Sequence, residues 1–117
     1  MKENVIKNKS FDFALRVVKL YQYLIDSKKE FVLSKQVLRS GTAIGALVCE
    51  SEHAESSADF IHKLSIALKE SNETEYWLRL LQKSNYISIK EFESLNSDLT
   101  EILKLLTSII KTTKSKK

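Results

Sequence analysis

The sequence predicts an all-α protein whose helices form an antiparallel up-down four-helix bundle. Proline is absent and only two glycines occur in 117 residues, so the chain has few of the residues that build tight turns between strands. Apolar residues recur at steps of three and four along four consecutive segments, which is the spacing of an amphipathic helix. Apolar residues make up 43% and charged residues 29% of the chain, as expected for one folded domain with one core.

The chain divides into one bundle with two terminal segments. We expect a flexible N-terminus over residues 1–9, the four-helix bundle over residues 10–110 and a basic flexible tail over residues 111–117. The first helix is expected to begin after Ser10, because serine is a favoured N-cap residue. Side chains at steps of three and four then predict the face that packs in the core. That face consists of Phe11, Ala14, Val18, Tyr21 and Ile25.

The second helix is expected to begin at Ser34 and to end near Glu50. Gly41 and Gly45 each cost about 1 kcal/mol relative to alanine inside a helix. We therefore expect another backbone to approach this helix closely at the glycines. The predicted core face of this helix contains Val37, Gly41, Ile44 and Val48.

Two serines mark the beginnings of the third and fourth helices. Ser56 precedes Asp59 by three positions, as in a capping box with Asp in place of Glu, whereas Ser88 and Glu91 form the full motif. The third helix is expected to end at Asn85. The apolar face of the fourth helix is regular and broad, which favours a bundle core over an isolated coiled coil. It contains Phe92, Leu95, Leu99, Ile102, Leu106 and Ile109.

Charge is distributed unevenly along the chain, whose formal net charge is +4. Residues 1–49 carry nine basic and four acidic side chains, residues 50–75 carry two and seven, and residues 76–117 carry eight and four. Basic surfaces can neutralise phosphates, so we expect RNA or DNA as a partner. The alternative is a structural or protein-binding scaffold without nucleic-acid affinity, whose charges serve solubility. The candidate phosphate contacts are Arg16, Lys19, Lys35, Arg39, Lys111, Lys114, Lys116 and Lys117.

The residue pattern argues against an enzyme. The chain lacks a Gly-x-Ser-x-Gly elbow and a glycine-rich phosphate loop. Glu50 with His53, and more loosely Asp59 with His62, have the spacing of metal ligands on a helix. Both pairs flank one predicted hairpin at a bundle end, so solvated charge at a helix junction is the preferred interpretation. We therefore expect no catalytic residue, no metal and no cofactor.

The single cysteine, Cys49, lies in an apolar stretch and is expected to be a buried packing residue. One cysteine excludes an intramolecular disulfide and fits a reducing, cytoplasmic location. No apolar run approaches the roughly 20 residues that cross a bilayer, so a membrane is not expected as a partner.

Two further features have alternative interpretations. The polar run 69–73 in the third helix is either a solvated face or an interhelical ion pair at a subunit contact. Four aromatic side chains are either core residues or anchors of an interface. They are Tyr21, Tyr23, Tyr76 and Trp77.

The segment Leu33-Ser-Lys-Gln-Val-Leu-Arg-Ser-Gly-Thr-Ala-Ile-Gly-Ala46 carries a family resemblance, which continues through Glu50 and the third helix to Tyr76-Trp-Leu78. It resembles the bacterial four-helix-bundle proteins first noted in intervening sequences of 23S rRNA genes, the S23-like type. Many members carry Asn-Ile-Ala-Glu where this chain has Leu47-Val-Cys-Glu50.

The resemblance covers roughly residues 10 to 110 and implies an antiparallel bundle that assembles as a ring-like homopentamer. It also implies kinship with the accessory variability proteins of diversity-generating retroelements, which bind nucleic acid and a reverse transcriptase. No catalytic residues are established for the family, so the resemblance implies a non-enzymatic protein with itself, nucleic acid or a protein such as a reverse transcriptase as partners.

Overall fold

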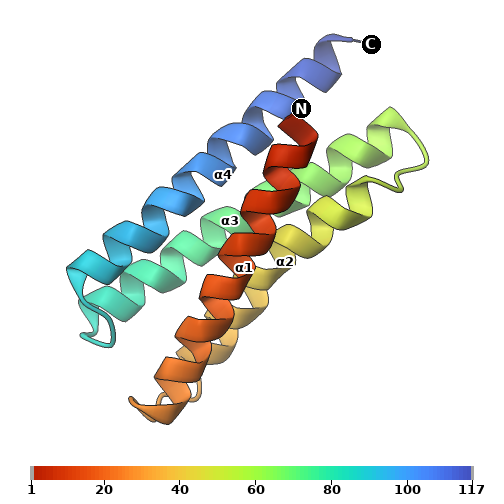
Figure 1. The fold of residues 1–117 in the computed structure, drawn as a ribbon. Coiled ribbons are helices and arrows are strands. Elements are labelled where there is room, and N and C mark those ends of the chain that lie inside the picture. Colours follow the sequence, from red (N-terminus) through yellow and green to blue (C-terminus); the bar gives the residue numbers. More distant parts are fainter. Residues whose placement is uncertain (1, 117) are drawn as a thin grey trace.

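The computed structural model describes residues 2–116, with side chains from residue 4 onward, and contains four α-helices and no strand in that range. The helices are α1 (Lys2–Asp26), α2 (Leu33–Ser51), α3 (Ser57–Lys83) and α4 (Ile89–Ser115). They lie side by side in an elongated molecule of 48 × 22 × 19 Å (Figure 1). The predicted all-α class is confirmed.

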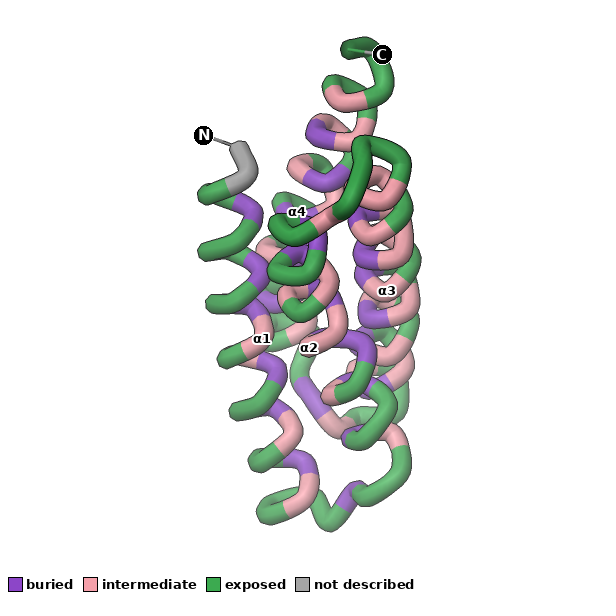
Figure 2. Tube along the Cα trace, turned by 90° about the vertical axis from the view of Figure 1, so that its right-hand side faces the viewer, coloured by how far each residue is buried: buried purple, intermediate pink, exposed green. Residues whose placement is uncertain are grey.

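Each helix packs against two others around a shared core. α1 contacts α2 and α4, and α3 contacts the same two helices. The buried positions follow the inner face of every helix (Figure 2). The fully buried large side chains include Phe13, Leu24, Ile44, Leu64, Leu78, Leu81, Leu99, Ile102 and Leu106.

The predicted beginning of the first helix is wrong. α1 begins at Lys2, so residues 2–9, which were expected to be flexible, belong to a helix. Ser10 is fully buried, and its hydroxyl donates a hydrogen bond to the carbonyl of Lys7 (3.2 Å). A serine can satisfy its hydroxyl inside a helix in this way, which removes the reason for placing a cap there. At the other end, α4 continues to Ser115 and includes most of the expected tail.

The predicted core face of the first helix is wrong for Phe11 and Val18, whereas Ala14, Tyr21 and Ile25 are half-buried. Phe11 and Val18 are 61% and 37% exposed, and Leu15 beside them is 49% exposed. The face that packs in the core is rotated about the helix axis. It contains Ile6, Ser10, Phe13, Val17, Leu20 and Leu24. α1 therefore has two apolar faces, and we call the exposed one, formed by Phe11, Leu15 and Val18, the outer face of α1.

The full capping box predicted for α4 is confirmed, whereas at α3 only the Ser56 half of the predicted box is present, because the Asp59 carboxylate accepts from the backbone N–H of Glu55. The Ser56 hydroxyl accepts a hydrogen bond from the backbone N–H of Asp59 (3.0 Å). At α4 the Ser88 hydroxyl accepts from the backbone N–H of Glu91, and the Glu91 carboxylate accepts from the backbone N–H of Ser88, each at 3.0 Å. α3 ends at Lys83, two residues before the predicted end.

The two glycines of α2 lie where α1 approaches most closely. A Cβ on Gly45 would lie 3.2 Å from the backbone oxygen of Ser10, which confirms the predicted approach of another backbone. A Cβ on Gly41 would lie 2.8 Å from both methyl carbons of Val17, so here the neighbour is a side chain. The absence of a side chain at both glycines allows α1 and α2 to lie at a short separation.

The start of α2 is stabilised by a residue that the sequence reading passed over. Glu30 follows Lys29, whose φ of 54° turns the chain, and its side chain folds back over the first turn of α2. The Glu30 carboxylate accepts hydrogen bonds from the backbone N–H groups of Val32 (3.2 Å), Leu33 (3.0 Å) and Ser34 (2.6 Å). Burial alone would raise the pKa of Glu30, but these donors outweigh it and lower the pKa.

Replacing Gly41 by alanine tests the contact with Val17. Helix propensity alone favours alanine by about 1 kcal/mol. We expect the G41A variant to be less stable than the wild type by about 1–3 kcal/mol, because the β-branched Val17 cannot move its methyl groups away at low cost. Urea unfolding followed by circular dichroism measures the difference. In a V17A background the same substitution should be neutral or stabilising, and equal losses in both backgrounds would contradict the proposed contact.

Replacing Glu30 by glutamine tests the cap of α2. We expect the free energy of unfolding at pH 7 to fall by about 1–2 kcal/mol, because the three N–H donors lose a charged acceptor. Since the folded-state pKa of Glu30 is lowered, its stabilisation is present above the unfolded-state pKa and is lost as the pH falls through the folded-state value. The wild type and the E30Q variant should therefore converge in acid.

The control for this experiment is Glu93→Gln, which changes an exposed glutamate of α4. Its stability should stay close to that of the wild type across the same pH range. An E30Q deficit that persists unchanged in acid would show that charge is irrelevant to the cap.

Candidate nucleic-acid interface

The basic side chains expected to contact phosphates lie in three separate places. Arg16 and Lys19 lie on α1 beside α4. Lys35 and Arg39 belong to the first turns of α2, and Lys111 and Lys114 to the last turns of α4, followed by Lys116. Lys117 lies outside the described residues. The predicted cations that the structure describes therefore do not form one continuous patch.

Arg16 is fixed against α4 by a set of hydrogen bonds. Its Nη1 atom donates to the Asp98 carboxylate (2.7 Å) and to the backbone oxygen of Ser94 (3.2 Å), and its Nη2 atom donates to the Ser94 hydroxyl (2.9 Å). Asp98 offsets part of its charge, while the fixed guanidinium forms one edge of a groove between the two helices.

This groove, which we call the α1–α4 groove, has a volume of about 670 Å³ and runs between the second half of α1 and the first turns of α4. Leu20 and Leu95, both buried, contribute its apolar lining. Glu91 is the lining residue with a carboxylate, and that carboxylate already accepts a backbone N–H in the capping box. The full lining is Arg16, Lys19, Leu20, Tyr23, Ser88, Lys90, Glu91, Ser94 and Leu95.

Lys90 is a cation of this groove that sequence reasoning missed. It lies in the first turn of α4, where the helix dipole disfavours a positive side chain. The sequence did contain a signal for it: a lysine in the first turn of a helix is unfavourable for the helix, which suggests another role for the side chain. With Arg16 and Lys19 from α1, it places basic side chains on both walls of the groove.

Arg39 is engaged by acidic residues of α3. Its guanidinium forms ion pairs with Glu70 (3.2 Å) and with Glu73. Trp77 Nε1 donates to the Glu73 carboxylate (2.9 Å), and this donor together with Arg39 lowers the pKa of Glu73. The hydrogen bond with Glu73 also raises the pKa of Arg39. Two carboxylates thus compete with any phosphate for this side chain, and the polar run 69–73 forms an interhelical ion pair within one chain.

The carboxylates of the two sequence pairs that have metal-ligand spacing, Glu50 and Asp59, make other contacts. Glu50 forms an ion pair with Lys63 (3.2 Å), and the Asp59 carboxylate accepts the backbone N–H of Glu55 (3.2 Å). Within residues 2–116 no three His, Cys, Asp or Glu side chains are grouped so that they could hold a metal ion. The two sequence pairs therefore do not combine into a ligand set.

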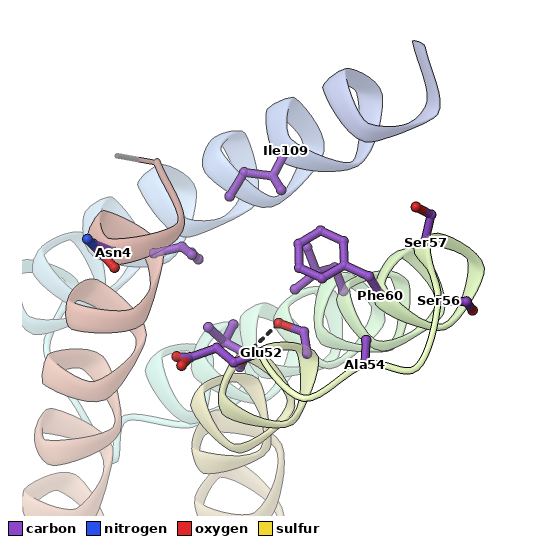
Figure 3. A pocket seen from close by; sticks show the side chains of 11 residues that line it. Asn4, Glu52, Ala54, Ser56, Ser57, Phe60 and Ile109 are labelled. Atoms are coloured by element: carbon purple, nitrogen blue, oxygen red, sulfur yellow. Dashed lines mark hydrogen bonds between the residues drawn. The ribbon is translucent and has the colours of Figure 1, made fainter. Parts of the chain in front are cut away.

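A second cavity, of about 530 Å³, opens at the end of the bundle where α2 is connected to α3 (Figure 3). Phe60 and Ile109 project into it from α3 and α4, whereas Ser56 and Ser57 lie at its outer edge. The carboxylate at its rim, Glu52, forms an ion pair with Lys7 (3.1 Å). Its apolar floor and paired charge do not resemble an acid–base or nucleophilic site.

The prediction that Cys49 is buried is wrong, because its side chain is exposed. Cys49 directly follows the buried Val48 and is therefore rotated off the core face of α2. It lines a groove of about 610 Å³ between α1 and α2, which we call the α1–α2 groove. The groove lies beside the outer face of α1 and includes Phe11, Ala14, Thr42, Gly45 and Ala46.

None of the helices described over residues 2–116 has the length and apolar character needed to cross a lipid bilayer.

Fold and surface together define a small all-α protein of four helices with a mixed basic groove. A model of the family described as 23S rRNA-intervening sequence protein matches residues 2–108, so the chain belongs to that family. Among the curated proteins, none matches the chain. The chain is also similar to a solved protein of the S23 ribosomal protein family from Bacteroides thetaiotaomicron, itself described as having unknown function. The two are 62% identical, the match covers 95% of this chain and 99% of the other, and the TM-score is 0.94.

Proposed function

We propose that this chain is a non-enzymatic, antiparallel up-down four-helix bundle that forms a homo-oligomer and binds RNA or DNA through phosphate contacts. The observation that carries the nucleic-acid part is the α1–α4 groove, where Arg16, Lys19 and Lys90 from two helices line one depression. Phosphate neutralisation by such side chains supplies sequence-independent affinity.

The antiparallel arrangement is supported by the order of the contacts between helices. Lys9 pairs with Glu101 and Arg16 with Asp98, so higher numbers in α1 meet lower numbers in α4. In the same way, Arg39 pairs with Glu73 whereas Glu50, further along α2, pairs with Lys63. Short connections between helices join such neighbours.

Self-association is supported by the outer face of α1. Phe11, Leu15 and Val18 are exposed on one side of this helix, although the opposite side already fills the core. Contiguous exposed apolar side chains commonly mark a protein contact, and here they continue into the α1–α2 groove. A ring-like homopentamer, as the family resemblance implies, would cover this surface through a repeated contact that closes on itself.

Oligomerisation would also strengthen nucleic-acid binding. One groove offers few cations, which limits the affinity of a single chain for phosphates. A ring repeats the groove on every subunit, and several weak contacts on one strand combine through effective concentration. The resemblance to nucleic-acid-binding accessory variability proteins supports the same proposal, with a reverse transcriptase as a further candidate partner.

The oligomer is tested by light scattering coupled to gel filtration. We expect the wild type to have about five times the chain mass of 13.4 kDa, and the F11E variant to have a lower mass. Phe11 is exposed in the single chain, so the helical circular dichroism signal of F11E should not change. The matched control is I89E, which places the same charge on another exposed apolar position. A wild type that stays at 13.4 kDa would contradict the proposal.

Nucleic-acid binding is tested by fluorescence anisotropy with a labelled RNA at increasing salt. We expect the double variant K19Q/K90Q to bind more weakly and to reduce the salt slope by about 1.4–1.8, because two phosphate contacts are removed. K69Q/K104Q makes the same change of charge outside the groove and should retain the wild-type slope. Equal losses in both variants would contradict the assignment to this groove, and an oligomer without affinity at low salt would support the scaffold alternative.

A further inference from the structure

Tyr23 is an aromatic side chain of the α1–α4 groove that phosphate binding alone does not use. It lines the groove and is 37% exposed. The ammonium group of Lys28 lies 5.9 Å from the centre of its ring. An aromatic ring surrounded by basic side chains in a groove is the combination with which proteins bind bases and phosphates of an unpaired strand.

The order of residues along α1 places this ring beside the cations. Arg16, Lys19 and Tyr23 are separated by steps of three and four, so they lie on one side of the helix. Lys90 lies on the opposite wall, in α4. Phosphates on either side of a base held at Tyr23 would therefore meet positive charge.

The size and lining of the groove favour a single strand over a duplex. Its volume of about 670 Å³ is in the range of pockets that enclose a small molecule. Leu20 and Leu95 are buried at the bottom of the groove, so the exposed part of the Tyr23 ring is the apolar surface that the face of a base can reach. In a duplex the faces of the bases are stacked on each other and cannot reach a ring inside a groove.

Tyr76 is another exposed aromatic side chain, and it lies outside the α1–α4 groove. Tyr76 on α3 is 58% exposed, and its ring packs edge-to-face against Trp77 with 5.0 Å between centroids. Trp77 Nε1 donates a hydrogen bond to Glu73, and the depression that contains Tyr76 is lined by Glu75, Arg79 and Lys83. Tyr76 therefore serves as a control that has an aromatic ring and basic neighbours on another surface, but whose ring is already packed against Trp77.

We propose that the α1–α4 groove is a binding site for single-stranded nucleic acid, in which an unpaired base stacks on Tyr23 while Lys19, Lys90 and Arg16 contact the adjacent phosphates. This inference rests on the proposed nucleic-acid function. It adds a preference for an unpaired strand and assigns that preference to Tyr23.

The experiment compares a labelled single-stranded RNA with the same strand annealed to its complement, using anisotropy at fixed low salt. We expect the wild type to prefer the single strand. Y23A should bind it about 5- to 150-fold more weakly, since stacking of one base contributes about 1–3 kcal/mol. Y23F keeps the aromatic face and should retain binding, whereas Y23L keeps apolar volume without that face and should bind as weakly as Y23A. Y76A should bind like the wild type.

Circular dichroism of each variant checks that the helices are retained, and the comparison of Y23F with Y23L remains decisive if Y23A unfolds. Equal affinity for the single strand and the duplex, or unchanged binding by Y23L, would overturn this inference. If K19Q/K90Q still weakens binding in that case, the proposed function stands without base recognition. If the wild type binds neither nucleic acid at low salt, both proposals fail.

Discussion

The close approach of α1 to α2 is the contact on which the outer face of α1 and the α1–α4 groove both depend. Gly45 lies against the backbone of Ser10 and Gly41 against Val17, so a larger residue at either position would force its neighbour to shift. This contact sets the rotation of α1 about its axis and turns Phe13 and Val17 into the core. The same rotation directs Phe11 outward and brings the side of α1 that carries Lys19 beside α4. The outer face of α1 and the α1–α4 groove are therefore two consequences of one packing arrangement.

Two small hydroxyl residues fix how far α2 and α3 are shifted along each other. Ser40 on α2 and Thr74 on α3 are fully buried, and the Thr74 hydroxyl donates to that of Ser40 (2.9 Å). A buried polar atom that loses its partner is costly, so a shift of one helix along the other is disfavoured. At the exposed side of the same pair, Arg39 spans Glu70 and Glu73. Specific polar contacts thus add a defined register to the non-directional attraction of the apolar core.

Local signals in the sequence predicted α4 and the start of α3, because capping needs only neighbours in the chain. They could not decide which apolar face of α1 packs inside, since Phe11, Ala14 and Val18 follow steps of three and four just as Phe13, Val17 and Leu20 do. That choice is made by the glycines of α2, a distant part of the sequence. The same limit applies to the surface: the acidic partners of Arg39 and the groove position of Lys90 follow from how helices pack. Glu30 was missed because a carboxylate that folds back over a turn has no fixed spacing.

The single tryptophan, Trp77, is an intrinsic fluorescent probe at the contact between α2 and α3. Trp77 is tied to Glu73, and Glu73 in turn holds Arg39, so the environment of the indole depends on α2 and α3 lying together. Its emission therefore follows the separation of that hairpin, while far-ultraviolet ellipticity follows helix content in the whole chain. A partly opened state with intact helices would be visible as a change in the first signal without the second.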